Sequence, residues 1–227
     1  MCACSASTRH RLSIRLPKWR RTTLPFVGND VVDLKEPGNI GKSKNLRFLK
    51  KILTDAEIEW VRKADDPDAA LWRFWAAKET AYKVIRKLSG EATFLPRRWP
   101  VVLREMHREL HEGTVIVGGQ EIFFSCRSDE DYLHCVGSDD ADVLRKSIKG
   151  VAFLSEDRRR DPSGYGRYCL IKSVAEQGLA ERRQIAVRRK KKNGELQPPQ
   201  LYIADRKSSM DISLSHDGRW IAYVFTA

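Results

Sequence analysis

A glutamate and a lysine four residues apart are the first feature of this sequence that could do chemistry. Residues 75–83 read Trp-Ala-Ala-Lys-Glu-Thr-Ala-Tyr-Lys. In an α-helix, at about 100° per residue, Glu79 and Lys83 share one face. Alone, such a pair is an ordinary surface ion pair that stabilises a helix by about 0.2–0.5 kcal/mol. A second carboxylate beside it would change that interpretation, because two acids next to a lysine can hold a divalent cation against phosphate groups.

Asp30 is the candidate for the second carboxylate. It lies within residues 26–34, whose β-branched side chains predict a short strand. Asp33 is an odd number of residues away, so its side chain should point to the other face of the strand. We therefore expect Asp30, and not Asp33, to meet Glu79. Lys78 falls in the apolar stripe of the helix, where its ammonium must meet an anion or extend to solvent.

A serine and a histidine stand at the end of another predicted strand. Residues 211–215 and 219–225 are typical of two strands of a hairpin, and Ser215 and His216 come just before the turn at Gly218. A histidine in a turn is usually solvated. His216 is therefore a functional candidate only if the fold brings this strand end to the carboxylates.

The elements that must position these residues indicate an α+β fold. Thr54 and Glu57 form a capping-box pattern, so a helix should begin at residue 55. Apolar residues at three- and four-residue steps predict a long buried helix over 68–88. The basic run 188–192 precedes Asn193-Gly194, which predicts a solvated hairpin tip. Further strands are expected at 113–119, 121–125, 132–136, 184–188 and 201–204, and a further helix at 165–176.

Composition and charge restrict the class of protein. The chain has 227 residues, a formal net charge of +12 and five scattered cysteines. It contains neither an apolar stretch long enough to span a bilayer nor the apolar segment of a secretory signal. We therefore expect a cytoplasmic protein with reduced thiols, no zinc site and no membrane partner. The positive charge predicts attraction to an acidic partner without identifying it.

Together the motifs resemble the 4′-phosphopantetheinyl transferase superfamily. Its members carry a Gly-x-Asp strand, a Trp/Phe-x-x-Lys-Glu-x-x-x-Lys helix and a Ser-x-Ser-His strand, which correspond here to residues 28–30, 75–83 and 213–216. The Arg-Phe…Thr-x-x-Glu pattern within 46–57 and the order of the motifs are similar to those of holo-acyl-carrier-protein synthases. The resemblance extends over residues 26–87 and 184–225.

The resemblance implies an enzyme that transfers the 4′-phosphopantetheine arm of coenzyme A to a serine of an acidic apo carrier protein, with Mg²⁺. Asp30 and Glu79 are then the metal ligands, and Glu79, Lys83 and His216 are the catalytic residues. The residues expected to contact coenzyme A are Lys83, Ser215, His216, Lys44 and Arg47, with Arg86 as a further candidate for a phosphate.

One departure from the family pattern concerns the metal site. The larger single-chain members usually carry a second acid two residues after the strand aspartate, where this chain has Val32. The ion should then keep extra waters, as Mg²⁺ commonly does. Glu79 could instead deprotonate the carrier serine, but one carboxylate cannot freely ligate and titrate at once.

The long middle segment predicts an internal duplication that compact synthases lack. Residues 121–136 can be laid on 211–224, with Cys126 where His216 stands. We expect a basic, disordered extension over 1–25 and two pseudo-symmetric lobes, 26–138 with the metal-site motifs and 139–227 with the Ser-His motif. One composite site would lie between the lobes of a monomer that is an internal pseudo-dimer.

Two other functions fit parts of the sequence. The net charge and the basic run would suit a non-enzymatic protein that binds RNA or DNA, but the aromatic residues are not interleaved with basic ones as in stacking platforms. A carrier-binding protein without catalysis would not need Asp30, Glu79, Lys83 and His216. The source of the carrier, in fatty-acid, polyketide or peptide synthesis, stays open.

Overall fold

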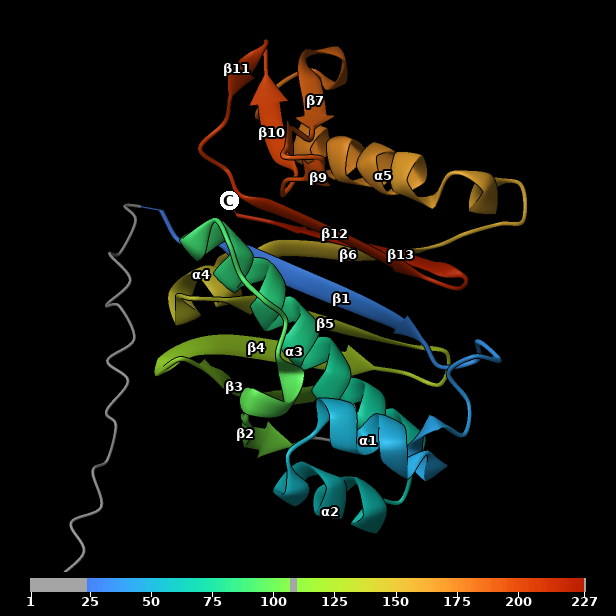
Figure 1. Ribbon diagram of the computed structural model, residues 1–227. Helices are drawn as coiled ribbons and strands as arrows, with labels where there is room; N and C mark the ends of the chain where they lie inside the picture. The colour runs from blue at the N-terminus through green and yellow to red at the C-terminus, as the bar shows by residue number, and fades with distance from the viewer. Residues whose placement is uncertain (1–23, 107–109, 227) are drawn as a thin grey trace, which may run out of the picture.

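The protein combines a five-stranded sheet with a smaller layer built on three-stranded sheets, each packed against one long helix (Figure 1). The computed structural model describes residues 24–106 and 110–226, so nearly all of the expected basic extension lies outside the described residues. The arrangement confirms the predicted α+β class. Across the described ranges, no helix has both the length and the apolar character that a membrane span requires.

Two long helices and a series of strands and short helices follow one another along the chain. Their bounds are β1 Val27–Asp33, α1 Leu46–Ile52, α2 Asp55–Lys63, α3 Pro67–Ser89, β2 Val101–Met106, β3 Leu110–Val117, β4 Gln120–Ser128, β5 Tyr132–Ser138, α4 Ala141–Lys146, β6 Ile148–Phe153, α5 Pro162–Glu176, β7 Ile185–Arg188, β8 Lys191–Lys192, β9 Glu195–Leu196, β10 Gln200–Ile203, β11 Arg206–Lys207, β12 Ile212–Asp217 and β13 Trp220–Phe225.

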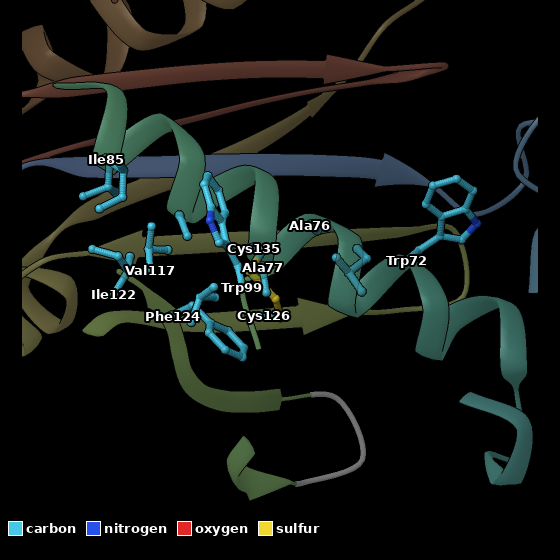
Figure 2. Close-up of a cluster of buried hydrophobic side chains, with 14 of the residues drawn as sticks. Trp72, Ala76, Ala77, Ile85, Trp99, Val117, Ile122, Phe124, Cys126 and Cys135 are labelled. Atoms are coloured by element: carbon cyan, nitrogen blue, oxygen red, sulfur yellow. A yellow bond between two sulfur atoms is a disulfide. The ribbon is translucent and has the colours of Figure 1, made fainter. Parts of the chain in front are cut away.

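The large sheet has the order β1-β5-β4-β3-β2 and is antiparallel. Helix α3 crosses one face of it and buries its apolar stripe there. Figure 2 shows side chains of α3, such as Ala77 and Ile85, in one cluster with Val117, Ile122 and Phe124 of the sheet. Helices α1 and α2 form a second apolar cluster with the first half of α3.

Local signals in the sequence set both ends of α3. The Asp66 carboxylate accepts from the Ala69 amide, and Pro67 occupies the first turn, where its missing N–H costs nothing. The helix ends at Gly90, whose φ of 73° is in the left-handed region that glycine adopts readily. These ends confirm the predicted helix over 68–88 to within one residue.

Lys78 is buried completely inside this core and meets an anion there. Its Nζ lies 2.6 Å from Glu57 Oε2 and donates to the Ile52 carbonyl at 3.0 Å. Glu57 also completes the predicted capping box with Thr54 and accepts from the Val101 amide. The Glu57 carboxylate therefore caps the start of α2, accepts from the first amide of β2 and neutralises the Lys78 ammonium of α3.

The smaller layer contains the sheet β12-β13-β6, against which α5 packs, and the sheet β11-β10-β7. The three strands β12-β13-β6 are arranged like β4-β5-β1 of the large sheet. In both sets a hairpin (β12–β13 or β4–β5) pairs through its second strand with an antiparallel strand from earlier in the chain (β6 or β1). The short hairpin β8–β9 turns at Asn193 and Gly194, both with positive φ, as the Asn-Gly pair predicted.

Strands β1 and β12 lie side by side without forming one sheet (Figure 1). Side chains of β12 and of the residue before it accept instead from amides of β1. The Val27 amide donates to Asp211 Oδ2 at 2.7 Å, and the Asn29 amide donates to Ser213 Oγ at 3.2 Å. The Asp33 amide donates to Asp217 at 2.9 Å, so the sequence separation is 184 in all three contacts and the strands run parallel.

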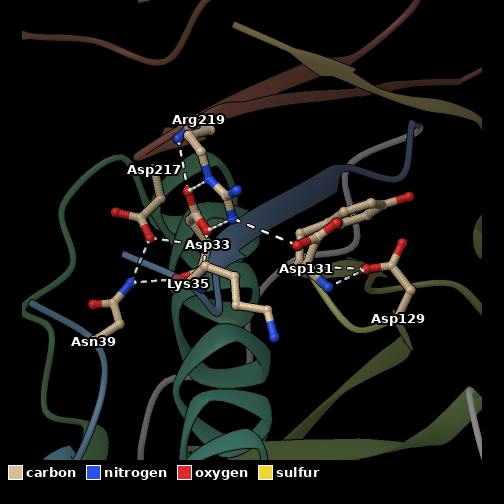
Figure 3. Close-up of polar contacts among 8 residues, drawn as sticks. Asp33, Lys35, Asn39, Asp129, Asp131, Asp217 and Arg219 are labelled. Carbon is tan, nitrogen blue, oxygen red and sulfur yellow. Dashed lines mark hydrogen bonds and ion pairs between the residues drawn. The ribbon is translucent and has the colours of Figure 1, made fainter. Parts of the chain in front are cut away.

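The carbonyls on the same edge of β1 are also bound by side chains. Lys87 donates to the Val27 carbonyl at 2.6 Å, Lys83 to the Asn29 carbonyl at 2.6 Å, and Asn39 to the Asp33 carbonyl at 2.9 Å. Figure 3 shows the far end of this junction, where Arg219 donates through its side chain to both oxygens of Asp33. The Asp33 carboxylate is thus occupied by Arg219.

Some elements and one bond were not predicted. Strands β2 and β6 and helices α1 and α4 are short and carry charged residues or a glycine, which weakens their periodic pattern. Cys126 and Cys135 form a disulfide, which corrects the expectation of reduced thiols at these two positions. They stand directly opposite each other in β4 and β5, a register that spacing along the chain does not reveal.

The Glu57–Lys78 pair gives a stability prediction. Replacing Glu57 with Gln should lower the free energy of unfolding by about 3–5 kcal/mol, because it leaves the Lys78 ammonium buried without a counter-charge. Urea denaturation would measure the loss, and adding Lys78→Met should recover part of it. Glu59→Gln is the control, since Glu59 and Lys63 are exposed and their pairing should matter by less than about 1 kcal/mol. Equal losses in the two single variants would contradict the prediction.

Candidate active site

The helix α3 approaches strand β1 closely at two glycines. Gly28 and Gly137 are cross-strand partners in β1 and β5. A Cβ at Gly28 would overlap the Thr80 carbonyl oxygen, and one at Gly137 would lie 2.7 Å from Thr80 Cγ2. Thr80 Oγ1 also donates to the Cys135 carbonyl at 3.3 Å. This contact fixes α3 on the sheet one residue after Glu79 and two residues along β1 from Asp30, and it explains the glycine of the Gly-x-Asp motif.

Asp30 and Lys83 meet beside that contact. Lys83 Nζ lies 3.1 Å from Asp30 Oδ1 and 2.6 Å from the Asn29 carbonyl oxygen. Burial raises the pKa of Asp30 above its ordinary value, and the charge of Asp217 adds to this effect, while Lys83 opposes both. The positive charge of Lys83 therefore does not fully offset the effect of burial on the Asp30 carboxylate.

Glu79 belongs to the same electrostatic group. Burial and the charge of Asp30 raise its pKa from 4.5 to about 7, and Lys83 acts in the opposite direction. Both carboxylates have raised pKa values, and the Asp30 charge contributes to that of Glu79, so the pair is under-supplied with positive charge. The arrangement suits a cation that could lie between them.

The Ser-His strand end opens onto the same place. A cavity of about 260 Å³ is lined by Asp30 and Lys83 from the first half of the chain and by Ser215 and His216 from the second. A neighbouring cavity of about 230 Å³ is lined by Glu79 and again by Lys83. The structure therefore brings Asp30, Glu79, Lys83, Ser215 and His216 to two neighbouring cavities from three separate segments of the sequence.

Two arginines that sequence reasoning missed also face this site. Arg167 from the first turns of α5 lines the larger cavity, and Arg189 lines both cavities. Burial lowers the pKa of Arg189, and the like charges of Arg167 and Arg86 lower it further. Such a group of cations around a cavity favours an anionic ligand. The sequence signal for Arg189 is the basic run 188–192, which is exposed as predicted, and Arg189 also lines the two cavities.

The three loosely expected phosphate contacts have different positions. Lys44 and Arg47 are exposed on the 3-10 helix Lys42–Lys44 and on α1, and neither lines either cavity. Arg86 does line the cavity with Glu79, where it donates to the Leu196 carbonyl at 2.9 Å.

A Mg²⁺ ion fits this donor set only as a partly hydrated ion. Asp30 and Glu79 supply two carboxylates with raised pKa values, which a divalent cation would lower. Among the residues that the structure describes, no cluster of three or more acids, histidines or cysteines could hold a metal. Phosphate oxygens or waters would have to complete the coordination of Mg²⁺, as is usual for this ion.

Comparison with known proteins agrees with the motifs. Residues 26–135 match the model of the 4′-phosphopantetheinyl transferase superfamily. Holo-[acyl-carrier-protein] synthases from two strains of Leptospira biflexa serovar Patoc are 34% identical to this chain over 65 residues. The aligned part is 29% of this chain and spans about half, 51%, of each relative's length. The matched region, residues 26–135, is just under half of the chain, carries Asp30, Glu79 and Lys83, and is similar to the 4′-phosphopantetheinyl transferase superfamily.

Proposed function

We propose that this protein transfers the 4′-phosphopantetheine arm of coenzyme A to a serine of an apo acyl or peptidyl carrier protein. The observation that carries the proposal is the shared cavity of Asp30, Lys83, Ser215 and His216. Asp30 and Lys83 come from the matched region, whereas Ser215 and His216 come from a hairpin outside it. An acid, a lysine, a serine and a histidine from separate parts of the chain thus line one cavity.

The reaction joins the carrier serine oxygen to the β-phosphorus of coenzyme A. The bond from that phosphorus to the bridging oxygen of the pyrophosphate breaks, and 3′,5′-adenosine diphosphate leaves with the bonding electrons. The proton of the serine hydroxyl passes to Glu79 or to a water molecule. Negative charge grows on the phosphate oxygens during this exchange, so catalysis depends mainly on positioning and on positive charge. Lys83, Arg189 and His216 can supply that charge and hydrogen bonds from the walls of the two cavities.

Asp30 and Glu79 would hold Mg²⁺, and the bound ion would supply positive charge to the pyrophosphate. Glu79 has a second possible task, since a carboxylate with a pKa of about 7 could accept the proton of the attacking serine near neutral pH. Occupation by a metal would hold Glu79 in its ionised form, so we rank the ligand role first.

The proposed partner is an acidic carrier protein. The net charge of +12 supports this choice, because opposite charges on two proteins increase the rate at which they meet. We propose further that residues 26–138 and 139–227 are two pseudo-symmetric lobes of one monomer. The common order of β4-β5-β1 and β12-β13-β6 supports this duplication. Cys126 is the position in the first half that corresponds to His216 in the second. Cys126 forms a disulfide, whereas His216 lines the cavity, so each half would supply a different part of the site.

The transfer reaction is tested directly by mass. Incubation with coenzyme A, Mg²⁺ and a panel of apo carriers should increase the intact mass of at least one carrier by one phosphopantetheine arm. Glu79→Gln should reduce the rate at least a hundredfold while the fold is retained, and Glu59→Gln, an exposed control on α2, should not. No mass increase on any carrier would overturn the enzyme reading, and tight, steeply salt-dependent binding to RNA would then favour the nucleic-acid alternative.

Magnesium dependence gives a second prediction. Asp30→Asn removes one negative charge from the ion, so the Mg²⁺ concentration for half-maximal transfer should rise at least tenfold. The measurement is a titration of transfer rate against Mg²⁺ at saturating coenzyme A. Asp66→Asn serves as the control, because it changes the N-cap of α3, thirteen residues before Glu79. An unchanged titration would remove Asp30 from the metal site.

The raised pKa of Glu79 gives a prediction for stability without metal. Unfolding returns this carboxyl to its ordinary pKa of 4.5, so between pH 4.5 and about 7 the folded protein binds more protons than the unfolded one. Stability of the wild type should therefore fall as the pH rises through this range, relative to Glu79→Gln.

The measurement is the melting temperature of both proteins from pH 5 to pH 8.5 in the presence of a chelator. The advantage of Glu79→Gln should increase with pH and level off above about pH 8. Addition of Mg²⁺ at pH 8 should reduce that advantage, because the ion binds only the wild type well. A difference that does not change with pH would show that Glu79 titrates normally.

A further inference from the structure

Asn29 connects the two halves of the site and has no role in the motifs. It is completely buried and comes directly before Asp30 in β1. Its side-chain Nδ2 donates to Ser215 Oγ at 2.9 Å and lies 3.3 Å from His134 Nε2. Its backbone donates to Ser213 Oγ and accepts from Lys83 Nζ, so the residue contacts the acid strand, the helix lysine and the Ser-His strand.

An amide is costly at this position. Asn29 lies between Val27 and Val31 on the same face of the strand, and both of these valines are buried. Its Oδ1 is buried and has no hydrogen-bond partner among the described residues. An unsatisfied buried acceptor costs about 1–3 kcal/mol, so the amide must bring a compensating advantage.

The contact with Ser215 indicates what that advantage is. A hydroxyl group has one proton to donate and can accept from other donors. Since Ser215 Oγ already accepts from the Asn29 amide, its own proton is left for a different acceptor. Ser215 lines the cavity that also contains Asp30, Lys83 and His216, where a phosphate oxygen would be such an acceptor.

His134 helps to fix the orientation of the amide. Burial, together with the charges of Lys149 and Lys83, lowers its pKa to about 3, so the ring is neutral near pH 7. A neutral imidazole offers one acceptor nitrogen, and Nε2 is within reach of the second N–H of Asn29. In the His134 tautomer with its proton on Nδ1, both amide protons of Asn29 have acceptors.

We propose that Asn29 is a positioning residue that orients the Ser215 hydroxyl to donate to a phosphate oxygen of coenzyme A. The inference rests on the proposed function, because it takes coenzyme A as the ligand of the cavity. It assigns Asn29 to binding of the ligand, and it predicts an effect that passes entirely through Ser215.

A double-mutant cycle on coenzyme A binding tests the proposal. The dissociation constant is measured by calorimetry with Mg²⁺ and without carrier for the wild type, Asn29→Val, Ser215→Ala and the double variant. Each single variant should weaken binding about tenfold, the usual size for one hydrogen bond to a charged group. The double variant should also weaken it about tenfold, since the second change removes nothing that remains. In transfer assays the KM for coenzyme A should rise tenfold, with kcat within twofold of wild type.

Asn39→Val is the matched control. Asn39 also joins β1 to β12, through the Asp33 carbonyl and the Asp217 carboxylate, but at the far end of the junction shown in Figure 3. It should lower the melting temperature and leave the dissociation constant within twofold of wild type. If Asn29→Val does not fold, Asn29→Ser, which is too short to reach Ser215, takes its place with the same expected values.

The outcomes separate this inference from the function on which it rests. A wild-type protein with no affinity for coenzyme A overturns the proposed function, and the inference with it. Normal wild-type affinity overturns the inference alone if the double variant binds about a hundredfold more weakly, because the two residues then act independently. Unchanged affinity of Asn29→Val, with a normal fold, has the same consequence.

Discussion

The close contact of α3 with β1 and β5 determines how Glu79 and Lys83 lie relative to Asp30. Thr80 rests on a pair of glycines, Gly28 and Gly137, and either one would meet Thr80 if it carried a side chain. Interiors are packed as densely as organic crystals, so a displaced helix cannot be accommodated by small adjustments nearby. Glu79 and Lys83 lie one residue before and three residues after Thr80, and a shift of the helix would move both relative to Asp30.

The junction between the two sheets carries the second part of the site. At this junction, amides of β1 donate to the side chains of Asp211, Ser213 and Asp217, directly before and along β12. The step at Ser215 is different, because that hydroxyl binds the Asn29 side chain instead of an amide of β1. Val31 is the residue of β1 whose amide would continue the row between Asn29 and Asp33. This amide instead forms a hydrogen bond with the Asp30 carboxylate. The cavity lies at this interruption in an otherwise regular row of contacts.

Much of this could be predicted from the sequence, and the remainder depended on register. The ends of α3, the capping box at Thr54 and the hairpin tip at Asn193 follow from local chemistry, and the structure has all three. Lys78 could be expected to meet an anion, but its partner Glu57 could not be chosen without the packing of α2 on α3. The disulfide between Cys126 and Cys135 and the approach of Arg189 to Lys83 both require the relative placement of strands and loops. The Asn193-Gly194 pair identified the hairpin correctly, and residues 188–192 are exposed, yet the sequence could not show that Arg189 lines both cavities.

Strand β1 is at the edge of the five-stranded sheet, and a bare edge of this kind is a template for pairing with another chain. Here the outward amides and carbonyls of Val27, Asn29 and Asp33 are already bound by aspartates, a serine, an asparagine and two lysines. A foreign strand would have to displace those groups one after another, and each of them would lose a hydrogen bond to β1. The same contacts that hold the Ser-His hairpin beside Asp30 therefore protect this sheet against aggregation through its edge.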